Sequence, residues 1–302
     1  MFFQKALQDP KPFWMYMVGT LVVFIVSQLG SIPLLLSVFY ASYLNGDDFP
    51  TNQFDMMTYL DLNLTLSLVI LTFIFGIIAL YFMVKWIHRQ SFLSIITSRD
   101  TLDWKRVFFA FGIWTLVSVT SIVIGYFTAP EDYVVQFQWQ PFLILVLVSF
   151  LLLPFQTSAE ELIFRGYLMQ GFGVLFRNRA LPLVLTSVLF GGLHYFNPEV
   201  AKMGSIVMVY YIGMGLFLGY MTVMDEGTEL ALGVHAANNI WAALLITADW
   251  TALQTNSLLR DVSEPSVGFE IVFPILIFIP ILFIFHKKFR WKNPVTHLQE
   301  TF

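Results

Sequence analysis

Two adjacent carboxylates and an arginine interrupt a long apolar stretch of the sequence. Glu160 and Glu161 are followed by Arg165, and residues 141–155 before them carry no charge. Ionised groups in hydrocarbon are costly unless they find partners, so such residues usually serve a function. On a helix, Glu161 and Arg165 are four positions apart and share a face, which predicts an internal ion pair. Glu160 then projects about 100° away and is free for another task.

Two histidine motifs on later apolar segments supply further groups for chemistry. Phe190 lies four positions before His194, and His235 lies four positions before Asn239, so the members of each pair share a helix face. A carboxylate in an apolar setting can take a proton from water. A histidine can hold that water, and histidine and asparagine donors can stabilise the oxyanion of a tetrahedral intermediate. Together these residues predict a hydrolytic site.

A metal ion is a second way to activate the water. His194, His235 and a carboxylate would supply the three protein ligands typical of catalytic zinc. The H-E-x-x-H helix of soluble zinc proteases is absent, and the sequence has no cysteine for a disulfide or a thiolate site. The residues therefore leave two alternatives open, which are no cofactor or a divalent metal such as zinc.

Composition indicates that these groups lie in a membrane protein. Of 302 residues, 57% are hydrophobic and 12% are charged, whereas a soluble domain carries about 25% charged residues. Mean hydropathy is +0.73. The net charge of −4 argues against a nucleic-acid partner, which would favour a basic face. We therefore predict a multi-pass integral membrane protein that is surrounded by lipid.

The hydropathy pattern predicts an all-α, polytopic transmembrane helix bundle of about eight spans. The expected spans are Phe13–Leu44, Leu62–Val84, Val107–Phe127, Pro141–Leu162, Leu181–Phe196, Ile206–Met224, Leu230–Ala248 and Val267–Phe285. Pro33 predicts a kink in the first span, and Gly215 and Gly219 predict close helix packing in the sixth. No repeat or linker divides the sequence, so residues 1–302 are expected to form a single membrane domain.

Helix geometry can bring the candidate groups to similar depths in the bundle. If the fourth and fifth spans turn near Asn178–Ala180, Glu160 and His194 lie within about 6 Å of one another along the helix axes. By the same rise per residue, His235 lies about 9 Å into its own span. We therefore expect the three side chains to meet in the cytoplasmic half of the bilayer.

The distribution of Lys and Arg predicts the orientation of the bundle. Basic residues gather before the first span, between the second and third, after the fourth and after the last. The positive-inside rule then places both termini in the cytoplasm. One connection on that side is acidic, with Asp225, Glu226 and Glu229, and is an exception to the pattern. Within the longest basic connection, Ser91–Ile96 is expected to form a short interfacial helix.

The three motifs resemble those of the CPBP family of intramembrane proteases, also called the CAAX-protease or Abi family. The family pattern is E-E-x-x-x-R, then F-x-x-x-H, then H-x-x-x-N, on separate transmembrane helices. All three motifs are complete and in this order, and the resemblance covers a core from residue 159 to residue 241. It implies an eight-helix membrane endopeptidase whose site opens toward the cytoplasm.

The resemblance also implies a role for each motif residue. Glu160 would activate the water, and His194 would help to hold it. His235 and Asn239 would form the oxyanion hole, while the second glutamate and the arginine of the first motif would brace the site. Both a metal-dependent and a metal-free, glutamate-activated mechanism have been argued for the family.

The expected function is that of a membrane-embedded endopeptidase acting on hydrophobic or lipidated peptide or protein substrates. Family members that act on prenylated proteins remove the last three residues after the lipidated cysteine, so CAAX-type substrates are included. Two other functions use the same polar residues. One is a non-catalytic membrane immunity or scaffold protein, and the other is an ion-coupled transporter, which would show related halves that this sequence lacks.

Overall fold

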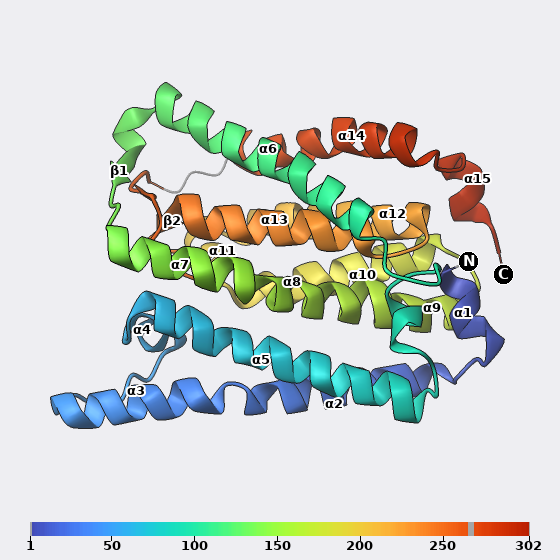
Figure 1. Ribbon diagram of the computed structural model, residues 1–302, viewed down its shortest axis with the longest axis horizontal. Coiled ribbons are helices and arrows are strands. Elements are labelled where there is room, and N and C mark those ends of the chain that lie inside the picture. The colour runs from blue at the N-terminus through green and yellow to red at the C-terminus, as the bar shows by residue number, and fades with distance from the viewer. Residues whose placement is uncertain (1, 265–268, 302) are drawn as a thin grey trace.

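A computed structural model describes residues 2–264 and 269–301 of the chain. Its long helices lie side by side in an elongated bundle, with both termini at the same end (Figure 1). The helices are α1 (Phe2–Gln8), α2 (Phe13–Leu29), α3 (Ile32–Asn45), α4 (Gln53–Thr58), α5 (Leu62–Phe82), α6 (Trp104–Thr128), α7 (Trp139–Leu151), α8 (Leu153–Glu161), α9 (Met169–Phe176), α10 (Ala180–Leu193), α11 (Pro198–Met203), α12 (Met208–Asp225), α13 (Glu229–Leu245), α14 (Phe269–Phe289) and α15 (Pro294–Gln299). This arrangement confirms the predicted all-α bundle. Helices suit a membrane because their backbone groups pair internally, as lipid requires.

Five helical stretches among the described residues are long and apolar enough to cross a membrane. They are Phe13–Asn45, Leu62–Ile87, Trp104–Thr128, Trp139–Phe176 and Ser205–Asp225, and Ala180–Phe196 is a shorter apolar helix. The predicted fourth span continues well beyond Leu162, because α7, α8, a π-helix and α9 follow one another without a loop. The predicted eighth span begins at Val267, outside the described residues, and its described part is α14.

The predicted kink in the first span is present as a break between two helices. α2 ends at Leu29, and α3 begins at Ile32 with Pro33 in its first turn. Gly30 at the break faces the backbone of α5, where a Cβ atom on this residue would lie only 2.5 Å from the carbonyl oxygen of Leu71. The break therefore combines a proline start with a close approach that only glycine permits.

Three short strands at the end opposite the termini were not predicted from the sequence. They are β1 (Tyr133–Val135), β2 (Ile246–Ala248) and β3 (Leu259–Asp261), in the sheet order β1-β3-β2 (Figure 1). β1 is antiparallel to β3, and β2 is parallel to it. The predicted seventh span was wrong in its last three residues, since Ile246–Ala248 pairs with β3 instead of continuing α13. β-Branched residues such as Ile246 and Thr247 suit a strand, but the pairing with a distant segment cannot be read locally.

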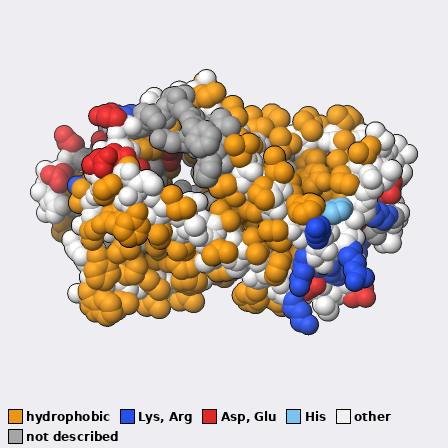
Figure 2. Space-filling view, turned by 90° about the horizontal axis from the view of Figure 1, so that it is seen from above, with side chains coloured by type: hydrophobic (Ala, Val, Ile, Leu, Met, Phe, Trp, Pro, Cys, Tyr) orange, Lys and Arg blue, Asp and Glu red, His pale blue; other side chains and the backbone are white. Residues whose placement is uncertain are grey.

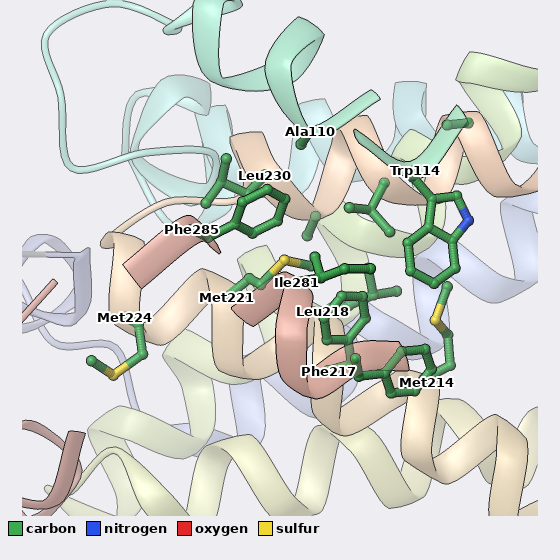
Figure 3. Packing of buried hydrophobic residues seen from close by; sticks show 14 of the residues in the cluster. Ala110, Trp114, Met214, Phe217, Leu218, Met221, Met224, Leu230, Ile281 and Phe285 are labelled. Carbon is green, nitrogen blue, oxygen red and sulfur yellow. The ribbon is translucent and has the colours of Figure 1, made fainter. Parts of the chain in front are cut away.

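The largest apolar cluster surrounds α13, the helix of the third motif, with α6, α12 and α14 (Figure 3). The rings of Phe217 and Phe278 stack with centroids 4.3 Å apart. Gly233 brings α13 against α6, where an added Cβ atom would lie 2.2 Å from the carbonyl oxygen of Val107. This close packing buries His235, which keeps 5% of its surface exposed.

The two ends of the molecule differ in charge. Figure 2 shows Lys and Arg side chains gathered at one end, acidic ones at the other, and a mostly apolar surface between them. The acidic connection that was an exception to the orientation pattern lies at the basic end, where Asp225 pairs with Arg99 and Arg106 and Glu229 pairs with Arg99. These carboxylates therefore neutralise basic neighbours and do not oppose the charge asymmetry between the two ends.

Candidate active site

The first motif lies where α8 passes into a π-helix, Leu162–Leu168. π-Helical turns are rare and often occur at functional sites. The predicted ion pair is present, with Arg165 Nη1 3.0 Å from Glu161 Oε1 and both side chains 0% exposed. Glu160, the last but one residue of α8, keeps 16% of its side chain exposed. The two neighbouring carboxylates thus have different environments, one sealed by an arginine and one reachable by a small molecule.

Arg165 is held by more than its carboxylate partner. Its Nη2 donates to the carbonyl oxygen of Gly215 at 3.3 Å, and its guanidinium lies 4.1 Å from the ring centroid of Phe190. Gly215 also permits close packing of α12 on α10, because a Cβ atom there would lie 2.8 Å from the carbonyl oxygen of Ser187. The G-x-x-x-G spacing in α12 therefore gives the close packing expected of it and also exposes an acceptor to the arginine.

His235 lies between the two carboxylates. Its Nδ1 is 2.7 Å from Glu161 Oε1, and its Nε2 is 3.6 Å from Glu160 Oε2. Because Glu161 also accepts from Arg165, it is the ionised partner, and Nδ1 must carry the proton that it donates. The unprotonated Nε2 then faces Glu160 Oε2 and can accept a proton that Glu160 has taken up.

A directed chain of hydrogen bonds ends on the other oxygen of Glu160. It begins at Trp114 Nε1, which can only donate and gives its proton to Asn238 Oδ1 at 3.1 Å. Asn238 Nδ2 donates to Asn239 Oδ1 at 3.0 Å, and Asn239 Nδ2 donates to Gln156 Oε1 at 2.8 Å. Gln156 Nε2 finally donates to Glu160 Oε1 at 2.7 Å. Since the donor-only indole fixes the orientation of every amide, the chain delivers a hydrogen-bond donor to Glu160 Oε1.

His194 makes its contacts outside this hydrogen-bonded cluster. Its Nδ1 donates to the carbonyl oxygen of Phe190 at 2.8 Å, and its ring stacks on that of Tyr211 with centroids 4.4 Å apart. Within the described chain no hydrogen bond joins His194 to Glu160 or His235. The Phe190 ring makes the connection instead, with centroids 4.8 Å from His194 and 6.0 Å from His235. Because Nδ1 is the donor, the neutral ring offers its Nε2 lone pair as an acceptor.

The donor set does not fit a zinc ion held by the predicted residues. Catalytic zinc takes three protein ligands, and the described residues contain no group of three or more His, Asp or Glu placed to hold a metal. Glu160 and His235 Nε2 approach one another, but no third ligand joins them among the described residues. We therefore derive no step through a metal.

A pocket of about 400 Å³ reaches the site from the end that carries the strands. Its wall includes Asn238 and Asn239 of the third motif, Tyr211 beneath His194, and residues of β2 and the segment that follows it. The strands lie opposite the termini (Figure 1). The family resemblance implied an opening on the side predicted for the termini, whereas this pocket opens at the other end.

Sequence reasoning missed three residues of the hydrogen-bond chain. Gln156 lies four positions before Glu160 and shares its helix face, a signal that was available in the sequence. Asn238 is not one of the motif residues, although it orients Asn239. Trp114 on α6 carries no local signal, because its contact with α13 depends on how the two helices pack.

The comparisons with known proteins agree with the family resemblance that the three motifs indicate. Residues 138–241 match the family model described as type II CAAX prenyl endopeptidase Rce1-like, which confirms for this segment the family predicted from the motifs. The chain is also similar to the uncharacterized protein YyaK of Bacillus subtilis (strain 168), with 29% identity over 295 residues that cover 96% of this chain and 98% of YyaK. No solved structure matches the chain.

Proposed function

We propose that this membrane protein, which carries an Rce1-like type II CAAX prenyl endopeptidase segment at residues 138–241, is an intramembrane endopeptidase. It hydrolyses peptide bonds of hydrophobic or lipidated substrates, with prenylated CAAX-type proteins among them, by an activated water. The observation that carries the proposal is the pairing of Glu160 with His235 at the end of a directed amide chain. This arrangement lies among apolar helices, where little water screens charges. Electrostatic stabilisation of a transition state is therefore stronger there than in water.

Glu160 is the general base of the proposed reaction. Gln156 holds its Oε1, which leaves Oε2 to take a proton from the attacking water. His235 Nε2, 3.6 Å from that oxygen, is placed to take up this proton, and once protonated it can donate to the developing oxyanion. The buried Glu161–Arg165 pair acts through His235 by fixing its ring and tautomer.

Asn239 and His194 bind the substrate and the water in this proposal. One amide hydrogen of Asn239 is donated to Gln156, and the second is available to the carbonyl oxygen of a substrate in the pocket that Asn239 lines. His194 offers Nε2 as an acceptor that can orient a water molecule. Both residues keep the roles expected from the family resemblance.

Replacing Glu160 with Gln tests the proposal, because the two side chains have the same shape. We expect the purified Glu160→Gln protein to fold normally and to lose cleavage of a farnesylated C-terminal peptide and of an unmodified hydrophobic control by about 10²-fold or more. Glu131→Gln, at an exposed connection, is the matched control and should retain wild-type cleavage. A zinc chelator in a parallel reaction tests for a metal requirement.

The outcomes separate the rival functions. Cleavage that survives in Glu160→Gln contradicts the proposed base. Cleavage by neither protein, together with an unchanged phenotype of the variant in cells, favours a non-catalytic immunity or scaffold protein. Proton flux into liposomes that requires Glu160 favours a transporter.

A further inference from the structure

A group of exposed basic side chains lies where α6 begins and α14 ends, at the end of the bundle that carries the termini. Figure 2 looks onto the face that these helices form and shows Lys and Arg gathered at one end of it. The members, here called the basic patch, are Lys105, Lys287, Lys288 and Arg290. Among the described residues no ion pair joins the basic patch to a carboxylate, whereas the neighbouring Arg106 is paired with Asp103 and Asp225.

The packing of α6 against α14 brings the patch residues of the two helices together. The ring centroid of Phe109 on α6 lies 5.6 Å from that of Phe289 on α14 and 5.3 Å from Lys288 Nζ. Lys105 is four positions before Phe109 and shares its helix face. Lys105 and Lys288 therefore lie along the same seam between the helices, although they are far apart in the sequence.

The turn after α14 keeps the basic side chains at the surface. Arg290 has a left-handed backbone with φ of 52°, and the next residue, Trp291, turns inward and is 8% exposed. The Trp291 indole donates to Asp225 Oδ1 at 2.9 Å. Asp225 also accepts from Arg99 and Arg106, so this carboxylate is occupied by inner donors. The positive charge of the basic patch is left for a group outside the chain.

The basic patch continues into an exposed apolar surface of the same helices. Lys287 Nζ lies 4.4 Å from the ring centroid of Phe283, and Phe283 is 57% exposed. On α6 the rings of Trp104 and Phe108 stack with centroids 5.8 Å apart, and the two residues are 58% and 67% exposed. Exposed aromatic rings with cations at the helix ends are typical of a membrane interface. A lipid matches both parts, because its headgroup can be anionic and its chains are apolar, whereas a soluble anion would use the cations alone.

We propose that the basic patch binds the anionic headgroup of a membrane lipid, while the chains of this lipid lie along the exposed rings of α6 and α14. An anionic lipid such as phosphatidylglycerol would then be preferred to zwitterionic phosphatidylcholine. The proposal goes beyond the endopeptidase function, since no residue of the basic patch belongs to the three motifs. It adds a lipid site at the end of the bundle that carries the termini.

The test measures which lipid lies beside Trp104 in vesicles that contain the full-length protein. The vesicles mix phosphatidylglycerol with phosphatidylcholine, and bromine atoms on the chains of one or the other lipid quench nearby tryptophan fluorescence. The signal of Trp104 is the difference between wild type and Trp104→Phe. We expect phosphatidylglycerol to be enriched beside Trp104. Replacing Lys105 and Lys288 together with Gln should lower its relative affinity by about fivefold for each charge removed.

Two further variants separate the basic patch from a general effect of charge. Lys105→Arg with Lys288→Arg keeps both cations and should keep the enrichment. Lys85→Gln removes an exposed lysine that follows α5, on the opposite side of the bundle from α6 (Figure 1), and should also keep it. Because Lys105 and Lys288 are exposed, the Gln variant should melt at the wild-type temperature.

The proposal is overturned by any of three results. The first is equal quenching by the two brominated lipids in wild type. The second is a Gln variant that keeps the enrichment, or a Lys85→Gln protein that loses it to the same extent. The third is inorganic phosphate that displaces phosphatidylglycerol more than chloride does at the same ionic strength, because the basic patch would then bind soluble phosphate.

Discussion

The buried pair of Glu161 and Arg165 gives the sharpest prediction about how the site is held together. Arg165→Met removes the positive charge and replaces the arginine with an unbranched apolar side chain. Glu161 then stays fully buried, with His235 as its single donor. Removing one partner of a buried ion pair costs about 3–5 kcal/mol, because the remaining charge stays desolvated. For a chain of this size a loss of 1 kcal/mol lowers the melting temperature by about 2 °C. We therefore expect a decrease of roughly 6–10 °C in detergent.

A double-mutant cycle separates this pairing from a loss of packing. Glu161→Gln alone leaves the arginine buried without its carboxylate and should cost about as much as Arg165→Met. The double variant contains no unpaired charge, so it should be more stable than the sum of the two single effects by about 2–3 kcal/mol. Melting followed by tryptophan fluorescence measures all four proteins. Lys11→Met breaks an ion pair whose acidic partner, Asp9, is 65% exposed, and should change stability by less than about 1 kcal/mol. Single effects that simply add, or an Arg165→Met protein as stable as wild type, would refute the reasoning.

Three further outcomes are expected from contacts outside the ion pair. Gly191→Ala should lower the melting temperature and peptide cleavage together, because its Cβ atom would lie 2.5 Å from a side-chain carbon of α12, whereas Gly192→Ala meets nothing within 4 Å and should be neutral. Asn238→Leu interrupts the amide chain and leaves Trp114 without an acceptor, so the free energy of unfolding, measured by melting, should fall by about 1–3 kcal/mol. In steady-state cleavage kcat should decrease by a larger factor than KM changes. Burial alone would raise the pKa of Glu226, but hydrogen bonds from a histidine, the amide of Phe2 and an arginine outweigh it and lower that pKa to about 2. Its stabilising contribution is therefore complete above pH 4.5, the ordinary pKa, and is lost toward pH 2. The melting-temperature difference between wild type and Glu226→Gln should accordingly shrink over that interval, and a constant difference would contradict the assignment.

Features that depend on local spacing were predictable from the sequence. The Glu161–Arg165 pair follows from a spacing of four on one helix. The turn expected at Asn178–Ala180 lies between the end of α9 at Phe176 and the start of α10 at Ala180. Ser91–Ile96 contains the expected short helix, a 3₁₀-helix at Phe92–Ile95. In each case neighbouring residues determine the geometry, so the sequence alone carried the information.

Features that depend on contacts between distant segments were not predictable. Trp114 joins the site because α6 packs on α13 across Gly233, and nothing near Trp114 in the sequence signals an acceptor. The strand at Ile246–Ala248 exists because β3 pairs with it, although its hydropathy continues that of α13. The contacts of His194 were not predictable either, because helix rise gives the axial depth of a residue and not the direction of its ring. The Phe190 carbonyl and the ring of Tyr211 fix its direction.

The site differs from a set of structural hydrogen bonds in how its two carboxylates are treated. Glu161 is fully buried and accepts from an arginine and an imidazole on Oε1, while its Oε2 has no partner among the described residues. Glu160 receives one amide on Oε1, while its Oε2 faces an imidazole nitrogen at 3.6 Å and its side chain remains partly exposed. An acceptor held in place on one side and left open on the other is what a general base requires. This asymmetry favours hydrolysis over a scaffold role.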